Sequence, residues 1–504
     1  MSTLKRFAGQ TAIYGLSTIL SRLLNFLLTP IYIRLYNAKV YGIFTYLYSW
    51  ASMLNAILAF GMETTFFRYL NKYENKKDQV YNNTFLAVAT TALLFLLFTI
   101  FFADGIASWM QRDHSSYHVD YVRYVKYFIY ILVADALAVI PFAKVRADGR
   151  PMRYGMIKFV NILTFIGLNL AFLFLIPYII KSGGSVALFL SEWYRPKWVG
   201  YVFISNLIAS IITLILLLPE LLKLKVKYDG PLVTEMLWYS FPVLIANISF
   251  IINENIDKIF LGRFLPPSIS EQEMGIYGAC CKLAIFLNIF IQAFRLGAEP
   301  FFFSYAKAEN AGQTYARVMN YFVITISVIF IALTANIEIL KYFIRGSHAQ
   351  QELYWSGLNV VPILLFGYVS LGIYMNLSIW YKLSDQTRFA LYISGVGAAL
   401  TIVLNVIFIP RYSYMASAWS SLIAYATMMI LSYLMGQKNY PIPYHLKKNV
   451  SYLLSAIGIV YLSFVIFDRN IIIGNLLLLL FIIITFLIEW KEVLKFSKLG
   501  LKKN

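Results

Sequence analysis

Charged side chains lie in the middle of a stretch that is otherwise apolar. The segment FIINENIDKIFLGRF, residues 250–264, places Glu254, Asp257 and Lys258 within five residues. Carboxylates and an ammonium in such a segment could bind an ion or a polar solute, or they could neutralise one another. Because a charge at the bilayer centre costs about 2.5–3.5 kcal/mol on insertion scales, these groups must face one another or water.

Three more apolar segments carry polar residues on one helical face, if each is a helix turning 100° per residue. Near 274–303 the stripe is Asn288, Gln292, Arg295 and Glu299, at spacings of four, three and four. Two stripes nearer the N-terminus are Thr18, Arg22, Asn25 and Thr29, and Ser52, Asn55 and Glu63. In the segment around Asp257 the shared face holds Asn247, Glu254 and Lys258, with Asn253 and Asp257 at its edge.

These residue types favour binding over catalysis. Arg pairs with phosphate oxygens, and Asn and Gln bond hydroxyl groups, so the stripes predict a hydrated cavity for an anionic, hydroxyl-rich solute. The predicted substrate-binding residues are Arg22, Asn25, Asn55, Lys258, Asn288, Gln292 and Arg295. The candidates for binding a coupling cation are Glu254, Asp257, Glu299 and Asp135. Two alternatives stay open: Glu254–Lys258 and Arg295–Glu299 could be internal ion pairs, and Asp135 a structural group near a helix end.

Other reactive side chains do not form sites. His114 and His118 have a spacing of four but no carboxylate cluster beside them, so we predict no metal site. Cys280 and Cys281 are adjacent within an apolar run, which predicts packing residues and excludes an extracellular disulfide framework. No catalytic residues and no bound cofactor are predicted.

The composition is that of a membrane protein. Of the 504 residues 60% are hydrophobic and 13% charged, whereas soluble domains are nearer half apolar and a quarter charged. The net charge of +19 lies in short connecting segments and forms no basic stripe interleaved with aromatic residues, so nucleic-acid binding is not expected. The fold class expected is an all-α polytopic membrane protein.

Apolar runs long enough to cross a hydrocarbon core of about 30 Å give about fourteen spans. They lie near 11–35, 41–70, 83–103, 119–143, 155–179, 199–222, 234–262, 274–303, 317–345, 353–378, 389–409, 413–436, 449–467 and 470–490. With both termini cytoplasmic, 26 Lys and Arg face the cytoplasm, 13 the other side, and 4 fall within spans. This excess favours that orientation and a retained first helix.

The chain resembles itself at an offset of about 235 residues. Gly42 and Asn55 align with Gly275 and Asn288, and FFRY (66–69) aligns with FFSY (302–305). Later matches are Arg153 with Arg388, Asn169 with Asn405, and Pro177 with Pro410. We therefore predict two parallel six-helix lobes, residues 1–228 and 229–440, and a terminal helix pair with a basic tail, residues 441–504. Transporters with such repeats bind substrate between the halves, and Pro30 and Pro242 are expected bending points.

Three segments carry a family resemblance. LSRLLNFLLTPIYIRLYNAKVYGIF (20–44), NIDKIFLGRF with MGIYGACCKLA (255–264 and 274–284), and residues 405–444 are similar to polysaccharide flippases of the O-antigen type. These belong to the multidrug/oligosaccharidyl-lipid/polysaccharide exporter superfamily. Tyr414 and Met415 replace a small, glycine-rich pair that is frequent there.

The resemblance implies a non-enzymatic flippase of a bacterial inner membrane that works by alternating access for surface polysaccharide or lipopolysaccharide biosynthesis. Its cargo would be an undecaprenyl-diphosphate-linked oligosaccharide, moved to the outer leaflet with coupling to protons or to sodium. Arg22 would engage the diphosphate, as an arginine of the first helix does in lipid II flippases. The partners implied are this cargo, membrane lipids and other polysaccharide assembly proteins. The alternatives are a cation-coupled multidrug exporter and, with less support, a glycan polymerase or ligase.

Overall fold

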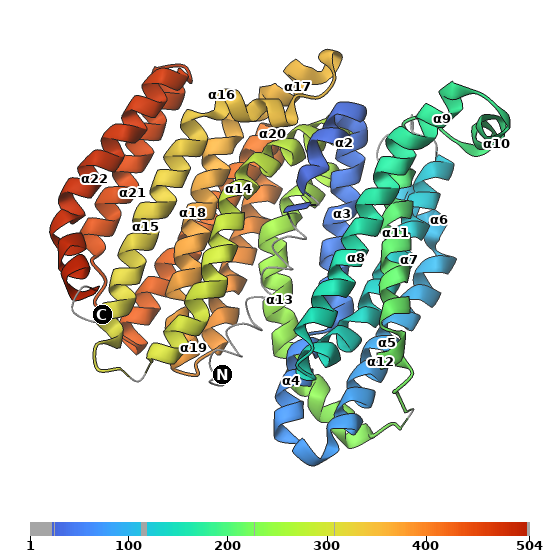
Figure 1. Cartoon of the computed structure of the whole chain (residues 1–504), viewed down its shortest axis with the longest axis horizontal. Coiled ribbons are helices and arrows are strands. Elements are labelled where there is room, and N and C mark those ends of the chain that lie inside the picture. Colours follow the sequence, from blue (N-terminus) through green and yellow to red (C-terminus); the bar gives the residue numbers. More distant parts are fainter. Residues whose placement is uncertain (1–22, 25, 112–117, 226, 307, 501–504) are drawn as a thin grey trace. The chain divides into compact units, whose positions relative to one another are not determined.

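The computed structural model describes residues 23–24, 26–111, 118–225, 227–306 and 308–500 (Figure 1). Helices make up nearly all of these residues, and no strand occurs among them. Eleven helical stretches in the described part of the chain are long and apolar enough to cross a membrane. The predicted all-α polytopic membrane fold is therefore confirmed.

The described residues pack into two compact units that are discontinuous in sequence. Unit 1 contains those of Met1–Ala279, Gly346–Tyr354 and Ser394–Ser420. Its complete helices are α2 (Thr29–Leu35), α3 (Ala38–Ala59), α4 (Met62–Lys72), α5 (Lys77–Phe101), α6 (Ala103–Met110), α7 (His118–Ala147), α8 (Pro151–Leu170), α9 (Ile176–Ser182), α10 (Ser185–Trp193), α11 (Gly200–Leu216), α12 (Leu218–Leu221) and α13 (Gly230–Phe264). It also contains the first turns of α14 (Pro267–Tyr305) and part of α20 (Arg388–Asn439).

Unit 2 contains the described residues of Cys280–Arg345, Trp355–Ile393 and Ser421–Asn504. Besides the rest of α14 and α20, its helices are α15 (Ala311–Ala335), α16 (Ile337–Leu340), α18 (Val361–Leu377), α19 (Ile379–Leu383), α21 (Leu446–Tyr461) and α22 (Ile471–Gly500). The short α17 (Gln351–Trp355) spans the boundary between the two units in sequence. The predicted lobe boundaries after residues 228 and 440 are not tested by this division and stay predictions.

Within unit 2 the terminal helix pair packs on α15 around one buried carboxylate. Glu489 of α22 is 4% exposed and accepts hydrogen bonds from Tyr452 at 2.6 Å and Asn320 at 3.3 Å. Lys448 lies 2.7 Å from the same carboxylate oxygen. Since a buried charge is tolerated only when it is paired, this cluster attaches α21 and α22 to α15.

The predicted number of spans agrees only in part with these helices. Two predicted spans, 389–409 and 413–436, lie in α20, which is interrupted at Ser413 (φ 47°, ψ −138°) shortly after Pro410. The predicted span 199–222 corresponds to α11, a shorter apolar helix, and most of the first span lies outside the described residues. The count of fourteen therefore stays a prediction. Pro30 lies in the first turn of α2, where its missing N–H costs no helical bond.

Local sequence sets the ends of two helices that matter below. The side chain of Asn37 caps α3 by accepting from the backbone N–H of Val40 at 2.9 Å. The same helix ends at Phe60 and Gly61, whose φ angles of 48° and 66° are left-handed. The side chain of Asp229 caps α13 in the same way, through the N–H of Leu232.

Two glycines that align in the internal repeat pack against one another where α3 crosses α14. A Cβ on Gly42 would collide with the carbonyl oxygen of Glu271, and a Cβ on Gly275 with that of Ala38. Each carbonyl lies four residues before the partner glycine, so the contact is reciprocal. Only glycine lets two helix backbones approach this closely.

A second aligned pair, Asn169 and Asn405, repeats the same hydrogen bonding. Both side chains are fully buried, and each donates to the backbone carbonyl four residues earlier, in Phe165 and Thr401, at 2.7 Å. Each amide oxygen accepts a hydroxyl hydrogen at 2.9 Å, from Tyr32 and from Ser417 respectively. Aligned residues therefore do equivalent structural work in both halves of the repeat.

The glycine crossing makes a stability prediction. Replacing Gly275 by Ala should lower the thermal unfolding midpoint of the purified chain, because its backbone partner cannot move aside as a flexible side chain would. Overpacking of this kind costs about 1–3 kcal/mol. Gly297→Ala is the matched control on the same helix, since no atom lies within 4 Å of its added Cβ. Equal midpoints for the two variants would contradict the crossing.

Candidate functional site

Asp257 and Lys258 of α13 contact one another and a neighbouring tyrosine. Asp257 is 2% exposed, and its carboxylate lies 2.9 Å from the ammonium of Lys258. Tyr277 of α14 donates to the other carboxylate oxygen at 2.7 Å, and Lys258 also donates to the backbone carbonyl of Glu254. Asp257, expected at the edge of the polar face, is therefore the centre of a buried and neutralised cluster.

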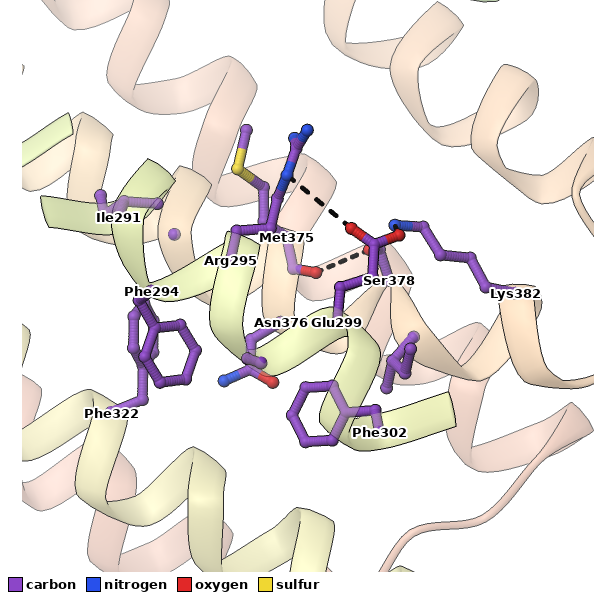
Figure 2. A pocket seen from close by; sticks show the side chains of 13 residues that line it. Ile291, Phe294, Arg295, Glu299, Phe302, Phe322, Met375, Asn376, Ser378 and Lys382 are labelled. Carbon is purple, nitrogen blue, oxygen red and sulfur yellow. Dashed lines mark hydrogen bonds and ion pairs between the residues drawn. The ribbon is translucent and has the colours of Figure 1, made fainter. Parts of the chain in front are cut away.

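The predicted stripe Asn288, Gln292, Arg295 and Glu299, called the α14 stripe below, forms a row of hydrogen bonds and ion pairs inside unit 2. Gln292 donates to Asn288 at 3.4 Å, and the Arg295 guanidinium lies 4.0 Å from the carboxylate of Glu299. Glu299 also accepts from Lys382 of α19 at 2.7 Å. Figure 2 shows Arg295 and Lys382 on opposite sides of this carboxylate. Two cations share one anion, which leaves one positive charge in excess.

The space beside these ion pairs is small and mostly apolar. Its walls include Ile291, Phe294, Phe302 and Phe322, and its volume is about 20 Å³. Such a space holds about one water molecule. This particular space is therefore too small to enclose an anionic group such as a phosphate.

Unit 1 contains a much larger cavity, of about 580 Å³, among its own helices. It brings together Asn55 and Asp135, two residues that the sequence analysis assigned to different roles. The polar lining comes from α3, α4, α7, α8 and α11, and its residues are Ser52, Asn55, Glu63, Asp135, Arg146, Tyr154, Lys158, Asn161, Asn206, Ser210 and Thr213.

The ionisable groups of this cavity have neighbours of opposite charge or polar partners. Arg146 forms an ion pair with Glu63. Asp135 accepts from Ser210 at 2.7 Å and attracts Lys158, whose ammonium lies 4.5 Å from the centre of the Phe142 ring. Polar groups in the middle of apolar helices are thereby stabilised around a space that water can enter.

The ion pairs of the two cavities are related by the internal repeat. Glu63 and Glu299 are separated by 236 residues, as are Arg146 and Lys382 and as are the aligned FFRY and FFSY segments. Glu63 contacts Arg146, and Glu299 contacts Lys382, so the same pair forms within each half of the repeat. From the sequence, Arg146 and Lys382 were expected only to be charges of connecting segments. The repeat offset could have identified them, because an offset of 236 residues aligns Glu63 with Glu299 and Arg146 with Lys382.

Another charge cluster joins the turn between α7 and α8 to α12. Glu220 is fully buried and is held by Arg153 at 2.7 Å and Arg150 at 3.3 Å. Burial alone would raise the pKa of Asp148 in this turn, but hydrogen bonds from Lys144 and Arg150 outweigh it and hold that pKa below its usual value. These basic residues therefore stabilise the fold through ion pairs, in addition to favouring the predicted cytoplasmic side for this turn.

Several predicted residues cannot be placed. Arg22, Asn25 and His114 lie outside the described residues. His118 lies 3.0 Å from Gln111 and 3.2 Å from Asp104, and the described residues contain no group of three His, Cys, Asp or Glu that could hold a metal. Cys280 and Cys281 are both buried. The binding and ion-coupling roles given to individual residues stay predictions.

The repeated ion pair predicts a charge-swap result. Glu63→Arg or Arg146→Glu alone should lower the thermal unfolding midpoint, because each leaves two like charges together; the double variant should recover most of the loss. Because both side chains are partly exposed, we expect each single variant to lose about 1 kcal/mol of unfolding free energy. Glu74→Arg, at an exposed site, is the control. A double variant as unstable as the sum of the singles would contradict the pairing.

Comparison with protein families identifies the family to which the chain belongs. The family model described as polysaccharide biosynthesis protein matches residues 7–305, which is more than half of the chain. A second model, described as MatE, matches residues 242–407. No curated protein sequence matches the chain.

Solved structures show the same fold at low identity. The lipid II flippase MurJ in its inward closed conformation has a TM-score of 0.66 and 14% identity, covering 94% of this chain and 98% of that one. An inward-facing MATE multidrug resistance transporter has a TM-score of 0.63 and 12% identity, over 85% and 97%. A point mutant of the Vibrio cholerae MATE transporter VcmN has a TM-score of 0.59 and 13% identity, over 86% and 96%. The chain therefore belongs to the polysaccharide biosynthesis protein family and has the fold of these flippase and transporter structures.

Proposed function

We propose that this protein moves an undecaprenyl-diphosphate-linked oligosaccharide from the cytoplasmic to the outer leaflet of a bacterial inner membrane, by alternating access and without covalent chemistry. Both termini would lie in the cytoplasm, as the distribution of Lys and Arg favours. The family match to polysaccharide biosynthesis proteins supports this cargo class. Other polysaccharide assembly proteins would supply and use the cargo.

One observation supports the proposal most strongly: the polar cavity of about 580 Å³ within the membrane-spanning helices of unit 1. Its lining mixes carboxylates, cations, amides and hydroxyls, all of which bond well to sugar hydroxyls. Keeping such groups inside apolar helices costs free energy, and a purely structural bundle would not need them. A hydroxyl-rich cargo gives these groups a function.

The cationic excess of the α14 stripe supports a charged group on the cargo. Arg295 and Lys382 share Glu299, so a phosphate oxygen approaching Arg295 would meet a net positive field. Arg295 is also the most exposed of the three, at 44% of its side chain. We propose that Arg295 attracts the diphosphate, with Arg22 in the same role by resemblance.

The coupling ion would be a proton or sodium. Asp257 and Glu299 each hold a lysine ammonium, at 2.9 and 2.7 Å, in the position that a coupling cation would take. Asp135 instead accepts from a neutral hydroxyl and faces the unit 1 cavity, and Glu254 is the remaining candidate. A coupling cation would have to displace a lysine ammonium to bind at Asp257 or Glu299.

A drug exporter is the second candidate, because a MatE family model and MATE structures also match. A site for apolar cations should be carboxylate-rich and otherwise apolar. The described lining of the unit 1 cavity has as many cations as carboxylates, which favours the oligosaccharide cargo. A polymerase or ligase would need a large outer segment with catalytic residues, and the sequence predicts none.

The proposed role of Arg295 can be tested in cells that depend on this protein for their surface polysaccharide. Arg295→Ala should reduce surface glycan roughly tenfold or more, because a hydrogen bond to a charged group contributes about 1.5–3 kcal/mol. Lys438→Ala, an exposed cation of α20, is the control. Full export by an Arg295→Ala protein present at normal abundance in the membrane would count against this site.

A further inference from the structure

The unit 1 cavity is much larger than its counterpart in the second half of the repeat. It is large enough for a small organic molecule, since such sites are typically about 300–1,000 Å³. The corresponding space in unit 2 holds about one water molecule and has aromatic walls (Figure 2). The helices that line the large cavity all belong to unit 1, so its shape follows from the packing of that unit alone.

The repeat separates shared charges from charges found in one half only. The Glu63–Arg146 pair recurs as Glu299–Lys382 at an offset of 236. At offsets of 235 to 236, Asp135 corresponds to Ser370 or Leu371, and Lys158 to Ile393 or Ser394. The second acid–base pair is therefore confined to the half that has the large cavity. A pair present in both halves is explained by a common scaffold, whereas a pair in one half requires a reason specific to that half.

Among the residues that the structure describes, the formal charge of the cavity lining is balanced. Its ionisable residues other than Tyr154 are Glu63, Asp135, Arg146 and Lys158, two acids and two bases. A charged group on the cargo would be attracted by two of these side chains and repelled by the other two, so this lining does not favour anions. This contrasts with the α14 stripe, where two cations share one carboxylate.

The remaining lining matches a sugar ring. Asn161 uses its amide nitrogen to bond Thr213 at 2.9 Å, and Asn206 uses its own to bond Tyr48 at 3.1 Å, so their carbonyl oxygens can accept hydroxyl hydrogens. Asn55 makes no side-chain hydrogen bond within the described part of the chain, which leaves its donors and acceptor for a ligand.

An aromatic surface completes the lining. The rings of Phe142 and Tyr154 lie edge to face with centroids 5.4 Å apart, and both residues line the cavity. The C–H face of a pyranose ring gains dispersion energy on such a surface.

We propose that the unit 1 cavity is a binding site for the uncharged, hydroxyl-rich sugars of the cargo, with Asp135 accepting from sugar hydroxyls and Lys158 donating to them. This inference rests on the proposed function and deepens it, because it assigns the sugar part to the neutral cavity and not to the cationic stripe. Asp135 is then a specificity residue for the glycan.

The first test measures binding to the purified full-length chain in lipid nanodiscs. The probes are polyprenyl diphosphate alone and the same lipid bearing either a neutral trisaccharide or one containing a uronic acid. We expect Asp135→Asn and Lys158→Gln each to weaken binding of the neutral trisaccharide lipid about tenfold and to leave polyprenyl diphosphate unchanged. Asp78→Asn and Lys77→Gln, at exposed sites of α5, are the matched controls and should change neither.

A second test leaves the cavity charges intact, so that it does not depend on whether those variants fold. Ser52→Cys, with Cys280 and Cys281 replaced by Ser, puts one thiol in the cavity lining. A soluble neutral trisaccharide should slow alkylation of this thiol at least threefold, whereas inorganic diphosphate should not. Equal alkylation rates with and without the sugar would overturn the proposal.

The outcomes separate this inference from the proposed function. If the wild-type chain binds the trisaccharide lipid and both cavity variants bind it equally well, the sugar site is wrong and the flippase is not affected. If the variants lose only a sodium or proton dependence, the cavity is a coupling site and the inference is again wrong. If the wild-type chain binds no saccharide lipid better than polyprenyl diphosphate, the proposed function itself fails.

Discussion

The cost of placing charge inside a membrane is the constraint on which this structure depends. Apolar helices supply the fold, and each ionised group among them must find an opposite charge, a hydrogen-bonding partner or water. Asp257 is held by Lys258 and Tyr277, and Glu489 by Lys448 and Tyr452, so these charges are used for packing. Of the charges that line cavities, those without a counterpart in the other half of the repeat, such as Asp135 and Lys158, are the ones left for function.

The internal repeat shows which features belong to the scaffold. The Gly42–Gly275 crossing, the buried Asn169 and Asn405, and the two Glu–cation pairs follow offsets of 233 to 236 residues and form equivalent contacts. Against this background the differences have meaning. One half has a large, charge-balanced cavity and the other a cationic stripe beside a nearly filled space. Division of the cargo into a neutral glycan and an anionic diphosphate would explain this asymmetry.

Much of the fold could be predicted from sequence because it depends on local patterns. Long apolar runs fixed the membrane class, and aligned residues such as Gly42 and Gly275 revealed the repeat. Pairing between helices could not be predicted in the same way. A helical wheel placed Asp257 at an edge, whereas a tyrosine of the next helix made it a buried centre. Arg146, Lys158 and Lys382 were overlooked because a charge near a helix end is normally assigned to topology.

The central claim is that a lipid-linked oligosaccharide crosses the membrane through this protein. The most direct measurement is made in vesicles containing the purified chain and a polyprenyl-diphosphate oligosaccharide, with a membrane-impermeant glycosidase outside. Because the glycosidase reaches only the outer leaflet, the account predicts that protein-containing vesicles lose nearly all of the glycan, whereas protein-free vesicles lose about half. Loss of only half in both, with export of an apolar cationic drug by the same vesicles, would contradict it.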